Sequence, residues 1–501
     1  MSTNHAFDAL LGGGSDRPFL SLEDGAVWTH GAFARRAARL QSVLEGQGVG
    51  IGDRVAVQVA KHPDALTLYA ACLRGGFVFL PLNPGYTPAE LDHFISDSEA
   101  ALLVCDAGHE DDVRPVAERS GARLATLDAL TSAIPGVAPG EITPRGANDL
   151  AAILYTSGTT GRSKGAMLTH ANLLSNAETL VEAWRFTEDD VLIHALPVFH
   201  THGLFVATNV CLAAGASMIV QPRFDPDAVL AAMPRASVLM GVPTFYVRLL
   251  DHPGLTREAA AGMRLFVSGS APMLPETHRA WEARTGTRIL ERYGMTETNM
   301  NASNPYDGER RPGTVGPPLP GVEIRITGEG RAPLPAGETG MVEVRGPNVF
   351  PGYWRLPERT AEELGPDGWF VTGDLGILSE DGYLSIVGRQ KDLVISGGYN
   401  VYPREVEQAL DDLPGVLESA VIGAPHPDLG EAAVAVVVPE PGARPEPAAL
   451  AEALAASLAR FKRPRSIVLA EALPRNAMGK VQKTLLRERY ADAFVLAQGR
   501  D

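Results

Sequence analysis

Apolar and polar positions follow two alternating periods along the first part of the chain. Apolar residues recur at helical spacing from Trp28 to Leu44, whereas residues 53–59 form a short, mostly apolar run after a glycine-containing turn. The same alternation continues with an expected helix over 63–73, strand over 78–82, helix over 88–98 and strand over 101–105. Strands that alternate with helices in this way predict a layered α/β fold with parallel strands.

A different pattern begins after Gly321. Residues 322–327, 340–346 and 382–388 alternate by twos between Gly-rich turns, as antiparallel strands do, and they predict a small β subdomain. Beyond Gly388 the remaining stretch of about 110 residues has strand and helix patterns of its own, which is enough for a small domain. We therefore predict an α/β protein with a large N-terminal domain of layered α/β subdomains plus the β subdomain, residues 1–388, and an α+β C-terminal domain, residues 389–501.

Charge and cysteine usage exclude several classes of protein. The 501 residues include 44 basic and 60 acidic side chains, a net charge of -16, so we expect neither a nucleic-acid nor a membrane partner. Cys72, Cys105 and Cys211 are far apart and lack metal-ligand spacing, which argues against a disulfide framework or a zinc site. No basic segment followed by an apolar core stands at the N-terminus, and we expect a cytoplasmic protein.

Small and hydroxyl-bearing residues dominate the segment from Tyr155 to Gly165, which follows an apolar, strand-like run over 150–155. Glycines let the backbone turn its N–H groups inward, hydroxyls add donors and Lys164 adds a positive charge, so the segment fits a polyphosphate. Two alternatives stay open: a flexible surface turn, and a hydrolase nucleophile elbow at Ser163, which lies in a Gly-x-Ser-x-Gly context. The Lys-Gly order departs from that of nucleoside-triphosphatase loops.

Residues 155–165, Tyr-Thr-Ser-Gly-Thr-Thr-Gly-Arg-Ser-Lys-Gly, resemble the phosphate-loop signature of the adenylate-forming superfamily. This superfamily includes acyl-CoA synthetases, peptide-synthetase adenylation domains and beetle luciferases. Further segments resemble it in order as far as Lys483. The resemblance implies ATP, Mg²⁺ and coenzyme A as cofactor and co-substrates, and it assigns phosphate binding to Thr156, Ser157, Gly158, Thr159, Thr160, Gly161 and Lys164.

Tyr293-Gly-Met-Thr-Glu297 resembles a second family segment. There the Thr, here Thr296, contacts the α-phosphate, and the Glu, here Glu297, holds the magnesium ion, with Thr156 expected beside it. By the same resemblance, the adenine and ribose contacts fall on Gly269, Ser270, Ala271, Pro272, Glu291, Arg292, Tyr293, Asp374 and Arg389. A carboxylate such as Asp374 suits ribose hydroxyls because it only accepts hydrogen bonds and has several lone-pair sites.

The C-terminal part carries two more matches. Gly388-Arg-Gln-Lys-Asp392 resembles the family hinge, with Lys391 as its pivot, and residues 473–483 resemble the catalytic lysine motif, with Lys480 in the catalytic place. The resemblance implies that a carboxylate attacks the α-phosphate of ATP to form an acyl-adenylate and pyrophosphate. A mobile C-terminal domain then rotates, and the loop with Gly397 and Gly398 reaches the acyl site, where a thiol displaces AMP. A lysine acetyltransferase acting on Lys480 is an expected partner, because bacterial relatives are controlled in this way.

The sequence as a whole is similar to malonyl-CoA and methylmalonyl-CoA synthetases, most clearly at residues 199–204 and 241–248. This likeness places His200 and His202 in the wall beside the reacting carboxylate, with His200 among the catalytic candidates. It also makes His202 and Met295 determinants of pocket size.

A dicarboxylate substrate keeps one ionised carboxylate that does not react, and burying it requires a cation. We expect Arg248 to bind that carboxylate bidentately; the alternative is a surface arginine on an amphipathic helix.

The predicted function is an AMP-forming ligase that makes malonyl-CoA or methylmalonyl-CoA. A carrier domain has no room after Lys483, which favours free coenzyme A as the thiol. Three other functions stay open: a medium-chain or aryl acyl-CoA synthetase, a serine esterase that uses Ser163, and a nonenzymatic nucleotide-binding protein.

Overall fold

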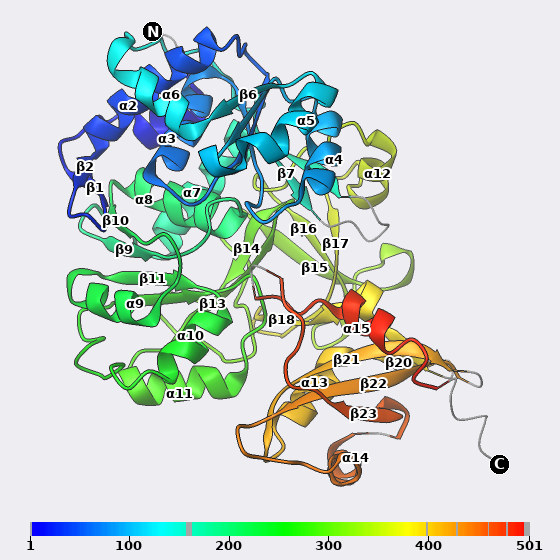
Figure 1. Cartoon of the computed structure of the whole chain (residues 1–501). Coiled ribbons are helices and arrows are strands. Elements are labelled where there is room, and N and C mark those ends of the chain that lie inside the picture. The colour runs from blue at the N-terminus through cyan, green and yellow to red at the C-terminus, as the bar shows by residue number, and fades with distance from the viewer. Residues whose placement is uncertain are drawn as a thin grey trace.

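Two largely parallel β-sheets form the framework of the N-terminal part of the molecule (Figure 1). The structure is a computed structural model that describes residues 3–156, 163–396, 399–426, 429–458, 460–476 and 479–494. The first sheet has the order β6 (Arg123–Thr126), β5 (Leu102–Cys105), β3 (Arg54–Gln58), β4 (Val78–Pro81), β7 (Leu150–Thr156) and β8 (Lys164–Thr169). Its strands run parallel up to β7, which pairs antiparallel with β8.

The second sheet is larger. Its order is β14 (Asn299–Ser303), β13 (Leu290–Met295), β12 (Leu265–Ser268), β11 (Val238–Gly241), β9 (Val191–His194), β10 (Ser217–Val220), β1 (Pro18–Ser21) and β2 (Val27–Thr29). The strands from β13 to β1 are parallel, and the two edge strands β14 and β2 are antiparallel to their neighbours.

Helices cover both faces of the two sheets. The largest core cluster lies between the sheets and includes α1 (His5–Leu11), α2 (His30–Gly46), α3 (Pro63–Gly75), α7 (His170–Ala183) and α8 (Asn209–Ala214), with α6 (Leu127–Ala133) at its side. The outer face of the first sheet packs against α4 (Pro88–Ser98) and α5 (Glu110–Ser120), and that of the second against α9 (Pro226–Ala232), α10 (Pro243–Leu250) and α11 (Pro275–Thr285). Side chains alternate accordingly, because Val55 and Val57 join the inner cluster and Ala56 the outer one.

An antiparallel sheet and the C-terminal domain complete the molecule (Figure 1). The sheet has the order β15 (Glu323–Thr327), β16 (Thr339–Arg345), β17 (Phe370–Leu378) and β18 (Leu384–Arg389), with α12 (Pro357–Glu363) between its middle strands in the chain. The C-terminal sheet contains β19 (Val394–Ser396), β20 (Tyr399–Val401), β21 (Val416–His426), β22 (Gly430–Pro439) and β23 (Ser466–Leu469). Its helices are α13 (Pro403–Asp411), α14 (Pro447–Ser457) and α15 (Lys483–Arg489).

The predicted fold class is confirmed: parallel α/β sheets precede an antiparallel sheet and a smaller C-terminal unit. The predicted helix over 88–98 coincides with α4, which starts at a Thr87–Glu90 capping box with Pro88 in its first turn. Strand β8 was missed, because only pairing with β7 reveals it. Sheet membership changes between Arg389 and Val394, and the boundary at residue 388 stays a prediction. Within the described part of the chain, no helix combines the length and apolar character needed to span a bilayer.

Candidate active site

A cavity of about 1720 Å³ lies where the two parallel sheets, the antiparallel sheet and the C-terminal domain meet. The parallel sheets line it with residues at the carboxyl ends of their strands, such as Leu82 after β4, Thr156 at the end of β7 and Ser270 after β12. In open α/β sheets this is the edge at which ligands bind. Lys480 lines the cavity from the C-terminal domain.

Asp374, Arg389 and Tyr293 form a buried hydrogen-bonded group beside the cavity. Asp374 lies opposite Arg389 in the β17–β18 register, and Arg389 Nε approaches Asp374 Oδ1 to 2.8 Å. The Tyr293 hydroxyl donates to Asp374 Oδ2 at 2.6 Å, and burial together with the Asp374 charge raises the pKa of Tyr293, so the phenol keeps its proton. Asp374 is therefore a strand residue with fixed partners, and the structure joins three of the nine residues that the resemblance had assigned to adenine and ribose.

The loop after β12 is shaped by its contact with Arg292. A Cβ placed on Gly269 would lie 2.5 Å from Nε of Arg292, so a larger residue there would require Arg292 to move. Ser270 has a φ of 69°, a left-handed conformation that such residues rarely adopt, and its Oγ lies 3.2 Å from Nδ1 of His202. The loop, which continues through Ala271 and Pro272 to α11, thus connects the predicted adenine side to the predicted acyl wall.

Glu291 on β13 is a buried carboxyl group on the same side. Burial raises its pKa to about 8. Among the described residues its Oε1 has no hydrogen-bond partner. Glu291 is not among the described residues that line the cavity, and the adenine role expected for it stays a prediction.

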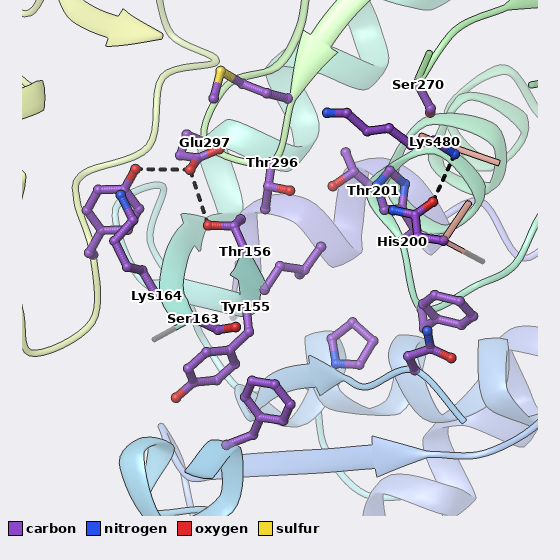
Figure 2. A pocket seen from close by; sticks show the side chains of 18 of the residues that line it. Tyr155, Thr156, Ser163, Lys164, His200, Thr201, Ser270, Thr296, Glu297 and Lys480 are labelled. Carbon is purple, nitrogen blue, oxygen red and sulfur yellow. Dashed lines mark hydrogen bonds between the residues drawn. The ribbon is translucent and has the colours of Figure 1, made fainter. Parts of the chain in front are cut away.

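Glu297 is the centre of a hydrogen-bond network on the phosphate side, which we define as Thr156, Lys164, Glu297, Tyr353, Arg359 and Glu363. Thr156 Oγ1 donates to Glu297 Oε1 at 3.4 Å, and the Tyr353 hydroxyl lies 2.9 Å from the same oxygen. Figure 2 shows Thr156 and Lys164 near Glu297, while His200, Ser270 and Lys480 lie on the opposite side with Thr296 between the two groups.

Glu363 on α12 neutralises two cations of this phosphate side. Both of its oxygens lie 3.2 Å from Lys164 Nζ, and Arg359 Nη2 approaches Oε1 to 2.5 Å. The Tyr353 hydroxyl lies 2.6 Å from Glu363 Oε2, and its ring lies 4.0 Å below Lys164 Nζ. Sequence inspection missed Tyr353, Arg359 and Glu363, because the segment between β16 and β17 contains no motif and only folding brings it to the cavity.

Lys480 stands in a loop that is anchored at both ends. Its backbone N–H donates to Asn476 Oδ1 at 3.0 Å, while Arg475 pairs with Glu418 on β21 and Lys483 pairs with Glu407 on α13. Desolvation in the cavity, reinforced by the charge of Arg389, lowers the pKa of Lys480 to about 8. The group is therefore a cation at neutral pH that loses its proton easily.

The acyl side, which we define as His200, Thr201, His202 and Arg292, contrasts with the phosphate side. Several buried polar atoms on this side have no hydrogen-bond partner among the described residues. They are Thr201 Oγ1, His202 Nε2, and Nε and Nη2 of Arg292. Burial and the Arg292 charge lower the pKa of both histidines, that of His200 to about 4, so both are neutral at pH 7. Burial lowers the pKa of Arg292 to about 9, which leaves it protonated. Met295 and Thr296 also line the cavity.

The structure does not bring Arg248 to this cavity. Helix α10 begins at Pro243, but Arg248 is exposed on it and is absent from the described lining of the cavity. The alternative of a surface arginine therefore holds, and the buried cation on the acyl side is Arg292, which the resemblance had grouped with adenine and ribose.

Some predicted residues cannot be placed. These predicted residues lie outside the described part of the chain: Ser157, Gly158, Thr159, Thr160, Gly161, Gly397 and Gly398. Lys391, the expected pivot, lies in the 3₁₀ turn Gln390–Asp392 between the antiparallel and the C-terminal sheets, and it lines the cavity.

Ser163 does not have the geometry of a hydrolase nucleophile. An elbow joins a strand to a helix, whereas Ser163 directly precedes β8, the antiparallel partner of β7. The nearby His93 directs its Nε2 to the Ser163 carbonyl oxygen at 3.1 Å. The esterase alternative is therefore not supported.

The residues present fit ATP and a magnesium ion. Thr156 and Glu297 offer the oxygen ligands that Mg²⁺ prefers, and Lys164 offers a charge for phosphate. Asp374, beside the cavity, offers a buried acceptor for ribose.

Comparison with known proteins identifies the class. Residues 8–354 match the AMP-binding enzyme family, and residues 405–480 match the AMP-binding enzyme C-terminal domain. The chain belongs to the AMP-binding enzyme family and is an AMP-forming acyl-CoA ligase.

Individual relatives show which members of the family this chain resembles. The solved structure of ATP-bound MatB from Rhodopseudomonas palustris is 54% identical, with a TM-score of 0.96 over 99% of this chain and 100% of that chain. The feruloyl-CoA synthase of an Amycolatopsis species is 38% identical over 93% of this chain and 94% of that protein. The malonate–CoA ligase of Arabidopsis thaliana is 34% identical over 93% and 85%, respectively. The protein thus resembles malonyl-CoA synthetases within the adenylate-forming superfamily.

Proposed function

We propose that the protein activates malonate or methylmalonate with ATP and transfers the acyl group to coenzyme A, releasing AMP and pyrophosphate. The observation that carries this proposal is Arg292, a buried guanidinium in the cavity wall with two nitrogen atoms, Nε and Nη2, that have no partner among the described residues. Both histidines beside it are neutral, so Arg292 supplies the positive charge on the acyl side.

A second carboxylate on the substrate explains the presence of the buried Arg292 guanidinium in the cavity wall. Arg binds a carboxylate through two parallel hydrogen bonds, and this pairing satisfies both the buried cation and the carboxylate that does not react. A medium-chain or aryl acid, the alternative that the feruloyl-CoA synthase relative keeps open, would leave the donors of Arg292 unsatisfied. The malonate–CoA ligase relative supports the dicarboxylate.

In the first step, the chain must bring two anions together, the substrate carboxylate and the triphosphate. Lys480 offers its ammonium to both from the C-terminal domain, Lys164 offers charge to the phosphates, and Thr296 lies between the two sides. Glu297 and Thr156 would hold Mg²⁺, which when bound supplies further charge neutralisation on the phosphates. Asp374 holds the ribose, so the α-phosphate is fixed relative to Lys480.

In the second step, rotation about Lys391 withdraws Lys480 and brings the loop with Gly397 and Gly398 to the acyl site, where coenzyme A displaces AMP. The position of Lys391 between two sheets supports this pivot. Acetylation of Lys480 by a lysine acetyltransferase would remove the ammonium and so stop the first step.

The test is pyrophosphate release with ATP, Mg²⁺ and coenzyme A across malonate, methylmalonate, acetate, octanoate and benzoate. It is run on the wild type, on Arg292→Met, and on Arg248→Met as a matched control on the surface. We expect malonate or methylmalonate to lead, Arg292→Met to lose that preference and Arg248→Met to keep it. A leading monocarboxylate would contradict the dicarboxylate assignment while leaving the ligase class intact.

A further inference from the structure

Lys61 is a partly buried lysine that contacts no carboxylate within salt-bridge distance in the described part of the chain. It lies between β3 and α3, and its Nζ is 2.8 Å from Nδ1 and 2.6 Å from the carbonyl oxygen of His194, at the end of β9. Burial lowers the pKa of Lys61 well below its usual value. Removing an ammonium from water without an opposite charge is unfavourable, so the contact with His194 requires an explanation.

The His194 ring connects Lys61 to a second segment of the chain. Because Lys61 donates to Nδ1, the ring proton of the neutral imidazole lies on Nε2, which donates to the carbonyl oxygen of Gly203 at 2.8 Å. The ring is neutral because burial and the nearby Lys61 lower its pKa to about 3. Thr208 Oγ1 donates to the same Gly203 oxygen at 2.9 Å, so this carbonyl is held by two donors.

Gly203 belongs to a π-helical turn, His202–Thr208, next to the acyl side. Such turns are rare and often occur at functional sites. A Cβ on Gly203 would lie 2.1 Å from the carbonyl oxygen of Pro197, so the turn is packed directly against the preceding loop. His202 begins this turn and lines the cavity.

We propose that Lys61 is a positioning residue for the acid-binding site: acting through His194, it fixes the π-helical turn and hence the place of His202 in the cavity wall. The two sheets are joined by this contact, since Lys61 follows a strand of the first and His194 ends a strand of the second. The role deepens the proposed function, because it concerns the same acyl side, but it does not depend on which acid binds there.

The test compares KM for the acid with KM for ATP by pyrophosphate release, using whichever acid the wild type turns over best. Lys61→Met keeps the chain length and removes the donors, and we expect KM for the acid to rise about tenfold while KM for ATP and kcat stay within about twofold. His194→Gln keeps an acceptor for Lys61 and a donor for Gly203, so it should retain most of the affinity for the acid. His194→Leu should match Lys61→Met.

A double variant shows whether the two residues act in series. Lys61→Met combined with His194→Leu should raise KM for the acid no further than either change alone. Lys462→Met, which breaks an ion pair with Glu405 in the C-terminal domain, is the matched lysine control and should behave like the wild type. The proposal is overturned if Lys61→Met leaves KM for the acid unchanged, or lowers kcat for all acids equally together with thermal stability. If the wild type does not turn over dicarboxylates, the proposed function is overturned, but the positioning role of Lys61 is not.

Discussion

The two ends of the cavity differ in how their charged groups are paired. On the phosphate side, Glu363 holds Lys164 and Arg359, and Tyr353 connects Glu363 to Glu297. On the acyl side, buried nitrogen atoms of His202 and Arg292 have no partner among the described residues. The charges described on the phosphate side thus form a closed ionic network that a nucleotide must rearrange, whereas the donors of His202 and Arg292 are already open to a ligand.

This difference separates stability from function. In a closed ionic network, breaking one partner leaves an uncompensated charge and destabilises the fold. Unsatisfied buried donors destabilise the fold until a ligand pairs with them, and such sites trade stability for activity. Variants on the two sides should therefore change stability with opposite signs.

The largest effect is expected at Lys480, which serves both sides from the C-terminal domain. Lys480→Ala removes the cation that offsets repulsion between the carboxylate and the phosphates, so adenylation should slow by about 10²–10³-fold. Pyrophosphate release in a single turnover measures this step. Thioester formation from a supplied acyl-adenylate is the control and should persist; unimpaired adenylation in the variant would contradict the role.

Glu363→Gln should break the closed network. The amide keeps the shape but leaves Lys164 and Arg359 without their shared counter-charge, so the free energy of unfolding should fall by about 2 kcal/mol. Urea unfolding measures the change. Glu362→Gln is a matched control, because Glu362 is 61% exposed and pairs with Arg359 at the surface, where ion pairs contribute little. Equal losses in both variants would show that the network adds no stability.

The pH dependence of adenylation should report the state of Lys480. Its pKa is lowered to about 8, so the required ammonium is present below pH 8 and is lost as the pH rises through that value. The rate of the first step should fall about tenfold per pH unit on the alkaline side. In Lys480→Arg the side chain stays charged, and the residual rate should show no such fall. An alkaline limb that survives in this variant would assign the titration to another group.

Arg292→Met should have the smallest effect on the free energy of unfolding, and the opposite sign. Replacing a buried cation that lacks partners by an apolar side chain should raise the free energy of unfolding by about 1 kcal/mol, even though binding of the acid is lost. Thermal unfolding without ligand measures it. Arg248→Met, at an exposed position, should change stability by less than about 0.5 kcal/mol. A destabilised Arg292→Met would mean that the acyl side is as closed as the phosphate side.

Local signals explain which parts of the fold and site were predictable. The capping box at Thr87 and Glu90 marks the start of α4, because the signal lies within a few residues. The glycines and hydroxyls after Tyr155 predict a phosphate loop from an equally local signal. Strand β8 and the π-helical turn at His202 carry no such signal, since pairing with β7 and packing against Pro197 determine them.

The sequence by itself predicted the ligase class and the order of most elements, and it pointed to Asp374 and Lys480, because these inferences depend on local periodicity and on motifs of adjacent residues. Tertiary structure alone decided which cation enters the acyl side. Arg248 and Arg292 are equally basic in the sequence, but α10 turns the first to solvent, and β13 holds the second in the cavity wall against Gly269. The direction of a side chain depends on what its element packs against, and that is known only once the sheets are assembled.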